Sequence, residues 1–405
     1  MTDRGILYVA AFLRSLATGM VGVLLGIYLA KLGLQAAAIG LVVGAGLAAA
    51  ALANLAAMAL ADRVGRRRFL VALSVLSGVG GAAAAVASTL AGLIPAAVVG
   101  MLNGMGRDRG GALVIEQAIL PSTTTDRERT RAFAWYNVLQ DAGHALGCLI
   151  AALPALLRST ASIEEIPAFR LSLGLYALLA LSPIPLYLSL SRSASDPPIE
   201  PRAPLAAGSR RILIKISSLF ALDSLGGGFL TTALLSYFFY ERFGVSEASV
   251  GLLFFGARVA NAISHLAAAW LARRFGLVNT MVFTHIPSSL LLVTVGFAPS
   301  YTIAAILFLL REGLVEMDVP TRQSYVMAVV QPSERTFASG LTHLVRLSAW
   351  AIAPALAGLF MQDVSLMMPL LIGAGMKIAY DVMLYLAFRG IRPPEEESGE
   401  PARRG

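Results

Sequence analysis

Apolar residues fill this chain in long continuous stretches separated by short polar segments. The stretches recur from position 5 to position 388, and each has roughly 20 or more residues, enough to cross a hydrocarbon core of about 30 Å as a helix. They predict an all-α membrane protein with twelve transmembrane helices, at 5–30, 37–61, 69–90, 94–120, 132–157, 168–190, 211–240, 247–271, 279–298, 300–326, 337–360 and 367–388.

Composition supports a membrane environment over a soluble one. Of the 405 residues, 57% are hydrophobic and 14% are charged, whereas soluble proteins have about a quarter of their residues charged. The first stretch contains Arg14 and exceeds the apolar region of about 7–15 residues in a signal peptide, so we expect it to remain as the first helix. The single cysteine, Cys148, excludes a disulfide framework and a cysteine-based metal site.

The net charge of +8 would suit nucleic acid in a soluble protein, but the positions of the basic residues favour an explanation by membrane topology. If the N-terminus is cytoplasmic, twenty of the 32 Lys and Arg residues fall on that side and four on the opposite side. This bias predicts a multi-pass protein of the cytoplasmic (inner) membrane with both termini cytoplasmic, and no nucleic-acid partner.

The second half of the chain repeats the first. Four positions around the second predicted helix recur 211 residues later, where Gly33, Gly40, Asp62 and Gly65 become Gly244, Gly251, Arg273 and Gly276. A proline-rich stretch lies between the two copies. We therefore expect an N-terminal six-helix domain at 1–190, a cytoplasmic linker at 191–210, a C-terminal six-helix domain at 211–390 and a disordered cytoplasmic tail at 391–405. Six helices per copy give both copies one orientation in the membrane.

The turn after the second predicted helix, Asp62-Arg63-Val64-Gly65-Arg66-Arg67-Arg68, resembles the loop motif Gly-x-x-x-Asp-Arg-x-Gly-Arg-Arg of the major facilitator superfamily, with Met58 at the leading glycine position. With the twelve predicted helices and the repeat, the chain is identified as a member of that superfamily over essentially its whole length. The resemblance implies two pseudo-twofold-related six-helix bundles around a central cavity and alternating access to that cavity.

The resemblance also implies a cytoplasmic gate closed by the motif. Its expected residues are Asp62, Arg63, Gly65, Arg66 and Arg67, together with Glu116 and Arg322 at the ends of the fourth and tenth helices. A simpler alternative for the arginines of the motif is that they only orient the chain in the membrane. For Asp62 this alternative is weaker, because an acidic residue does not contribute to that orientation.

Ionisable groups inside a membrane span cost several kcal/mol unless they are paired or face water, so each is a functional candidate. The set expected in substrate binding or coupling is Arg14, Arg107, Asp108, Arg109, Tyr136, Asn137, Asp223, Arg311, Glu312 and Glu316. Equivalent positions of the repeat carry opposite charges, as in Arg14 and Asp223. One hypothesis is that these two approach each other, or a shared substrate, across the cavity. The alternative is that each pairs within its own half.

Two groups of charges stand out in this set. Arg107-Asp108-Arg109 lies near the middle of the fourth predicted helix, where the two arginines would point about 200° apart, so only one would face the cavity. Glu312 and Glu316 are spaced four residues apart and would share a face of the tenth helix. Adjacent carboxylates of this kind suit a proton carrier.

No nucleotide-binding loop, nucleophile–base arrangement or metal-ligand spacing emerges, so we expect neither an enzyme nor a cofactor or metal. The prediction is a secondary active transporter that moves a small organic solute by alternating access, as proton-coupled export. Alternatives are a transporter of an anionic metabolite by uniport, import or exchange, and a non-transporting membrane sensor or lipid-handling protein. The expected partners are a small-molecule substrate, the lipid bilayer and protons, and the expected state is a monomer.

Overall fold

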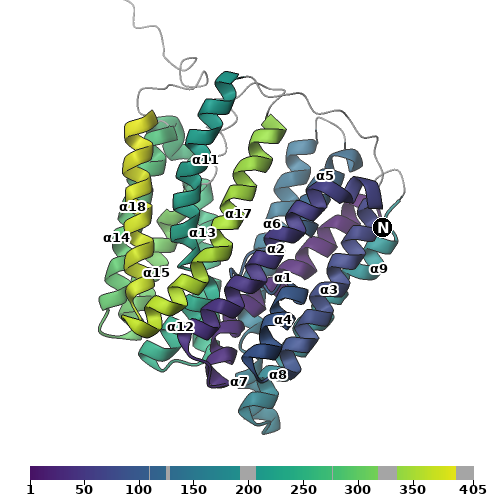
Figure 1. Cartoon of the computed structure of the whole chain (residues 1–405), viewed down its shortest axis with the longest axis vertical. Coiled ribbons are helices and arrows are strands. Elements are labelled where there is room, and N and C mark those ends of the chain that lie inside the picture. Colours follow the sequence, from purple (N-terminus) through teal and green to yellow (C-terminus); the bar gives the residue numbers. More distant parts are fainter. Residues whose placement is uncertain (109, 125–127, 192–206, 276, 318–334, 389–405) are drawn as a thin grey trace, which may run out of the picture. The chain divides into compact units, whose positions relative to one another are not determined.

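The computed structural model describes residues 1–108, 110–124, 128–191, 207–275, 277–317 and 335–388, and within these ranges the regular structure is helical (Figure 1). The helices are α1 (Asp3–Lys31), α2 (Ala36–Val64), α3 (Arg66–Val86), α4 (Leu90–Gly100), α5 (Gly111–Ile119), η1 (Leu120–Thr123), α6 (Arg129–Ile150), α7 (Leu153–Ala161), α8 (Glu165–Leu181), α9 (Pro183–Leu188), α11 (Ala207–Gly228), α12 (Thr232–Phe243), α13 (Glu247–Phe275), α14 (Leu277–Phe297), α15 (Tyr301–Val315), α17 (Arg335–Asp363) and α18 (Met368–Phe388).

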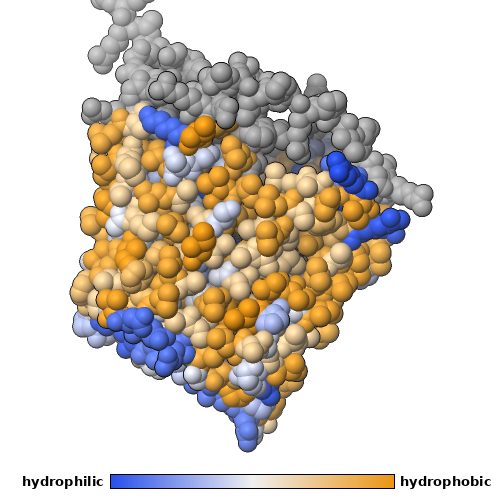
Figure 2. Space-filling model, viewed as in Figure 1, coloured by the Kyte–Doolittle hydropathy of each residue, from blue (hydrophilic) through white to orange (hydrophobic). Residues whose placement is uncertain are grey.

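The predicted all-α membrane class is confirmed. In the described part of the chain, nine helical segments are long and apolar enough to cross a membrane, and apolar side chains cover much of the visible surface between hydrophilic residues near the helix ends (Figure 2). Each of the twelve predicted spans contains helix. Three of them are divided by short interruptions, between α6 and α7, between α8 and α9, and between α11 and α12.

The fourth predicted span differs more, because the continuous helix expected at 94–120 is wrong. Helix α4 ends at Gly100 and α5 begins at Gly111. Met101 and Gly106 have φ angles of 48° and 66°, which an α-helix cannot accommodate. The Asn103 side chain accepts a hydrogen bond from the Met105 amide and donates one to the Arg107 carbonyl, so it replaces helical bonds with local ones. The argument that Arg107 and Arg109 point 200° apart therefore fails.

Contacts group the described helices into two compact units. Unit 1 comprises residues 1–200, 228–258 and 350–369, and unit 2 comprises 201–227, 259–349 and 370–405. Unit 1 therefore joins the first predicted half to parts of α13 and α17 and to the whole of α12. In unit 2, α14 packs against α15, and an apolar core of residues from α11, α14 and α18 includes Phe220, Met281 and Tyr380.

Glycines allow close backbone packing at equivalent positions of the repeat within unit 1. A Cβ added at Gly40 would lie 2.2 Å from the Pro354 carbonyl oxygen, and one added at Gly251 would lie 2.4 Å from that of Cys148. Gly33 and Gly244, also equivalent, both have positive φ angles, of 82° and 63°. The duplicated sequence pattern thus corresponds to duplicated turns and duplicated close contacts, α2 against α17 and α13 against α6.

We expect Gly40→Ala to destabilise the packing of α2 on α17 by about 1–3 kcal/mol, because the new methyl group overlaps a backbone oxygen. Gly174→Ala is the matched control, since a Cβ there would meet no atom within 4 Å. The measurement is maleimide labelling of a cysteine at Ala36, which is buried and whose carbonyl lies against Gly358. Labelling should accelerate only with Gly40→Ala, and equal rates in both variants would contradict the close contact.

Candidate functional site

Arg14 of α1 bridges two buried carboxylates in unit 1. Its Nε donates to Asp108 Oδ2 at 2.5 Å, and its Nη1 and Nη2 donate to Glu116 Oε1 and Oε2 at 2.8 Å each. The contact with Glu116 is bidentate, the geometry in which a guanidinium binds a carboxylate most strongly. Both carboxylates come from the broken fourth span, Asp108 from the non-helical segment and Glu116 from α5.

Two tyrosines complete the environment of Glu116, which is fully buried. Tyr136 of α6 donates to Oε2 at 2.6 Å and Tyr187 of α9 donates to Oε1 at 2.5 Å. Arg14 Nη1 also donates to the Tyr187 hydroxyl at 2.7 Å. Each oxygen of Glu116 therefore accepts two hydrogen bonds. This arrangement compensates an ionised carboxylate for the loss of water and holds Arg14 in place.

Asp108 has a different environment because it lines a cavity. The cavity has a volume of about 60 Å³ and is also lined by Arg14, Thr18 and Ser74, which is room for a few water molecules. Asp108 Oδ1 accepts from the Gly110 amide at 3.1 Å, and the Asp108 amide donates to His144 Nε2 at 2.8 Å. Of the two carboxylates bound to Arg14, Asp108 is thus the one that borders space for water.

The charges of this cluster do not balance. With both carboxylates ionised, Arg14, Asp108 and Glu116 carry a formal charge of −1, and one added proton makes the group neutral. Uncompensated charge is costly in a membrane-spanning domain. Glu116 accepts four hydrogen bonds, whereas Asp108 borders the cavity, so the two carboxylates differ in their access to space for water.

The segment that carries Asp108 is held by the second copy of the repeat. Three consecutive carbonyl groups accept hydrogen bonds from residues of unit 1 that belong to the predicted second half: Gly104 from the Ala233 amide at 2.9 Å, Met105 from the Thr232 hydroxyl at 2.7 Å and Gly106 from Arg258 Nη2 at 3.0 Å. The two halves are therefore joined two residues away from Asp108.

Unit 2 contains a second buried cluster of charges. Lys377 Nζ of α18 donates to Asp223 Oδ1 of α11 at 2.9 Å and lies 3.4 Å from His285 Nε2 of α14. The other ring nitrogen of His285 is 2.9 Å from Asp381 Oδ2. All four side chains are buried. With a neutral His285 this cluster also has a formal charge of −1, and a protonated His285 neutralises it.

Other predicted residues of unit 2 lie on α15. Arg311 donates to Glu312, and its guanidinium lies 5.8 Å from the centre of the Phe308 ring. Glu312 also accepts from Asn261 Nδ2 at 2.8 Å. Helix α15 ends at Val315, so Glu316 follows the last helical residue. The structure thus pairs Glu312 with a cation and an amide.

The remaining predicted site residues fall in several places. Arg14 and Asp223 each have an ion-pair partner within their own unit, which favours the alternative of pairing within each half. Arg107 is half-buried, and Asn137 is exposed and lies outside the Arg14 cluster. Arg109 and Arg322 lie outside the described residues.

The predicted gate turn joins α2 to α3 at Gly65, whose φ of 99° requires glycine. Arg66 Nε donates to Asp62 Oδ1 at 2.7 Å, and Arg66 Nη1 donates to the Ala118 carbonyl near the end of α5 at 3.2 Å. Arg63 is exposed and Arg67 is half-buried. Glu116, predicted as part of this gate, instead binds Arg14, because α5 turns its side chain into the core of unit 1.

The predicted site residues lacked four members of these clusters, Tyr187, His285, Lys377 and Asp381, and they also lacked Arg258. Tyr187 is one of several aromatic residues in the predicted apolar spans, and nothing in the sequence distinguishes it from the others. His285 did carry a signal, since it is an ionisable residue in a long apolar stretch. Arg258 binds a carbonyl of the broken segment, a contact that requires knowing that the fourth span is not helical. Tyr187 could be found only from the folded chain, whereas Arg258 carried the same signal as His285, because it is an ionisable residue inside a predicted span.

We expect Arg14→Gln to lower the free energy of unfolding by about 3–5 kcal/mol, because it leaves two buried carboxylates without their cation. Thermal or denaturant unfolding of the purified protein measures this. Arg242→Gln, at an exposed position, is the control and should change stability by about 0.5 kcal/mol or less. The double variant Arg14→Gln/Glu116→Gln should be more stable than Arg14→Gln alone. Equal instability of the two would contradict the charge argument.

Comparison with known proteins places the chain in a family. A sequence profile described as Major Facilitator Superfamily matches residues 7–240 and 216–405. The chain is 25% identical over 426 aligned residues to "Uncharacterized membrane protein YJR124C" of Saccharomyces cerevisiae, covering 96% of this chain and 94% of the relative.

Two solved structures show the same fold. A crystal structure of the nucleoside transporter NupG gives a TM-score of 0.73 at 14% identity, covering 96% of this chain and all (100%) of that chain. The inward-open xylose transporter XylE from E. coli gives 0.71 at 14% identity, covering 96% and 98%. Because the profile matches two ranges that together span nearly the whole chain, this protein belongs to the Major Facilitator Superfamily of membrane transporters.

Proposed function

We propose that the protein is a secondary active transporter that exports a small organic solute in exchange for protons, with Asp108 as the proton-carrying group. The observation that carries this proposal is the unequal environment of the two carboxylates bound to Arg14. Glu116 is enclosed by four hydrogen-bond donors, whereas Asp108 borders a water-sized cavity. A buried group that can gain a proton and thereby become neutral is the element that proton coupling requires.

The bonds around Asp108 support a link between proton binding at Asp108 and a change of conformation. Protonation weakens the ionic bond from Arg14 Nε to Asp108 and leaves the bidentate bond from Arg14 to Glu116. Asp108 lies two residues after Gly106, the last of the three residues whose carbonyls bind Ala233, Thr232 and Arg258. Alternating access moves the halves against each other, so contacts of this kind must break and re-form. The proton site and these contacts share one short non-helical segment.

The alternative of an anionic substrate has less support. It rested on arginines inside the spans, and Arg14 is neutralised by two carboxylates. Four of its five N–H groups have acceptors among the described residues. A sensor or lipid-handling protein would need no proton acceptor beside a cavity. The proposal also includes a cytoplasmic gate at the turn between α2 and α3, cytoplasmic termini and a monomeric state. These three parts rest on the sequence alone.

Transport in proteoliposomes tests the coupling. A thermal-shift screen of small organic solutes against the purified protein first selects a ligand. For a proton exchanger, an acidic interior should drive uptake of that ligand. A gradient of one pH unit supplies about 1.4 kcal/mol per proton, or about tenfold accumulation. Asp108→Asn should abolish accumulation but keep exchange at equal pH, because the amide retains the size of the side chain and cannot take up or release a proton.

Asp141→Asn, an exposed carboxylate on α6, is the matched control and should accumulate the ligand as the wild type does. Uptake driven by an alkaline interior would show symport and contradict export. Undiminished accumulation by Asp108→Asn would remove Asp108 from the coupling, and a ligand that binds but never crosses the membrane would favour the sensor.

A further inference from the structure

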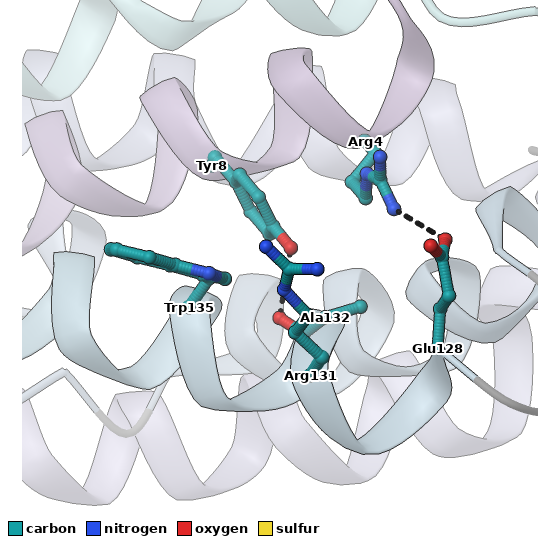
Figure 3. A pocket seen from close by; sticks show the side chains of 6 residues that line it. All are labelled: Arg4, Tyr8, Glu128, Arg131, Ala132 and Trp135. Atoms are coloured by element: carbon teal, nitrogen blue, oxygen red, sulfur yellow. Dashed lines mark hydrogen bonds and ion pairs between the residues drawn. The ribbon is translucent and has the colours of Figure 1, made fainter.

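A groove with two arginines lies where α1 and α6 begin (Figure 3), and none of the residues that line it belongs to the Arg14 cluster. It has a volume of about 230 Å³ and is lined by Arg4, Tyr8, Glu128, Arg131, Ala132 and Trp135. All six belong to unit 1. Nothing in the proposed transport mechanism uses these residues.

The groove carries a positive charge that its own acid does not cancel. Arg4 Nη1 lies 3.5 Å from Glu128 Oε2, a loose and solvent-exposed pair. Arg131 is exposed and has no ion-pair partner among the residues that the structure describes. The Tyr8 hydroxyl donates to the Ala132 carbonyl at 2.9 Å, and the Arg131 guanidinium lies beside that hydroxyl (Figure 3). Two arginines and one glutamate give a formal charge of +1 around a cavity.

An apolar surface continues from this groove along both helices. The Trp135 indole is 52% exposed at the edge of the groove, and Val9 on α1 and Val138 on α6 are 40% and 54% exposed. Basic residues beside exposed aromatic and aliphatic side chains are typical of a membrane–water interface. A free anion would leave this apolar surface uncovered, whereas a molecule with an anionic head and an acyl chain would cover both parts.

We propose that the groove binds the phosphate head group of an anionic phospholipid. Arg131 provides the main charged contact, Arg4 adds a second when its loose pair with Glu128 opens, and Trp135 packs against the lipid next to its head group. Helices α1 and α6 supply Arg14 and Tyr136 to the buried cluster. A lipid that holds their first turns together therefore stabilises the scaffold of that cluster.

Native mass spectrometry of the purified full-length chain in detergent tests the proposal. Phosphatidylglycerol and phosphatidylcholine are titrated separately, and retained lipid is counted. Phosphatidylglycerol should bind more tightly, and Arg131→Gln should weaken it about fivefold, the effect of one basic residue at an anionic membrane surface. Arg68→Gln is the matched control, because it removes one exposed arginine from the first turn of α3 without touching the groove, and should bind as the wild type does.

Equal losses in Arg131→Gln and Arg68→Gln would overturn the site in favour of general attraction to basic residues. Equal binding of the two lipids would overturn it as well. Glycerol 3-phosphate is added as a competitor that carries the phosphate without acyl chains. Failure of millimolar glycerol 3-phosphate to displace the lipid supports the proposal, and efficient displacement would assign the groove to a soluble phosphate ester instead. Both variants should keep the unfolding temperature of the wild type in detergent without added lipid.

Discussion

A guanidinium inside a membrane-spanning domain must be neutralised, and much of unit 1 follows from how Arg14 meets this requirement. One carboxylate would suffice for charge balance, but Arg14 has two. Glu116 and its two tyrosines form a rigid receptor for the cation, and both tyrosines belong to a buried apolar core of unit 1. The second carboxylate, Asp108, is the one that borders a cavity. One guanidinium thus links a fully enclosed acid to an acid beside room for water.

The break in the fourth span is what allows this linkage. A continuous helix would place residues 108 and 116 about two turns apart along one axis, too far for both to reach a single guanidinium. The non-helical segment lets Asp108 approach from a different direction than Glu116 does. It also exposes backbone carbonyls, which in an intact helix would be occupied. The second copy of the repeat binds those carbonyls, so the same irregularity serves the charge cluster and the junction between halves.

The sequence predicted the class of fold well because long apolar stretches and a repeated glycine pattern are direct consequences of membrane insertion and duplication. Gly33 and Gly40 were recognisable from their copies, and the structure gives both copies the same role. The membership of Arg14, Asp108 and Tyr136 in a buried cluster was also within reach, since ionisable residues are rare in spans. Their partners were not, because hydropathy cannot show which faces of different helices meet.

The bonds to Gly104, Met105 and Gly106 use main-chain oxygens rather than side chains. Every residue type supplies such an oxygen, so these bonds constrain the path of the backbone rather than the identity of the side chain. A change of side chain at Met105 would therefore leave the bond from Thr232 available. Space limits the other two positions, because a Cβ at Gly104 would lie 2.7 Å from Val43 Cγ1, and Gly106 has a positive φ and lies close to Thr232. In evolutionary terms, the junction depends on where the backbone runs, so it persists through side-chain changes that do not crowd it.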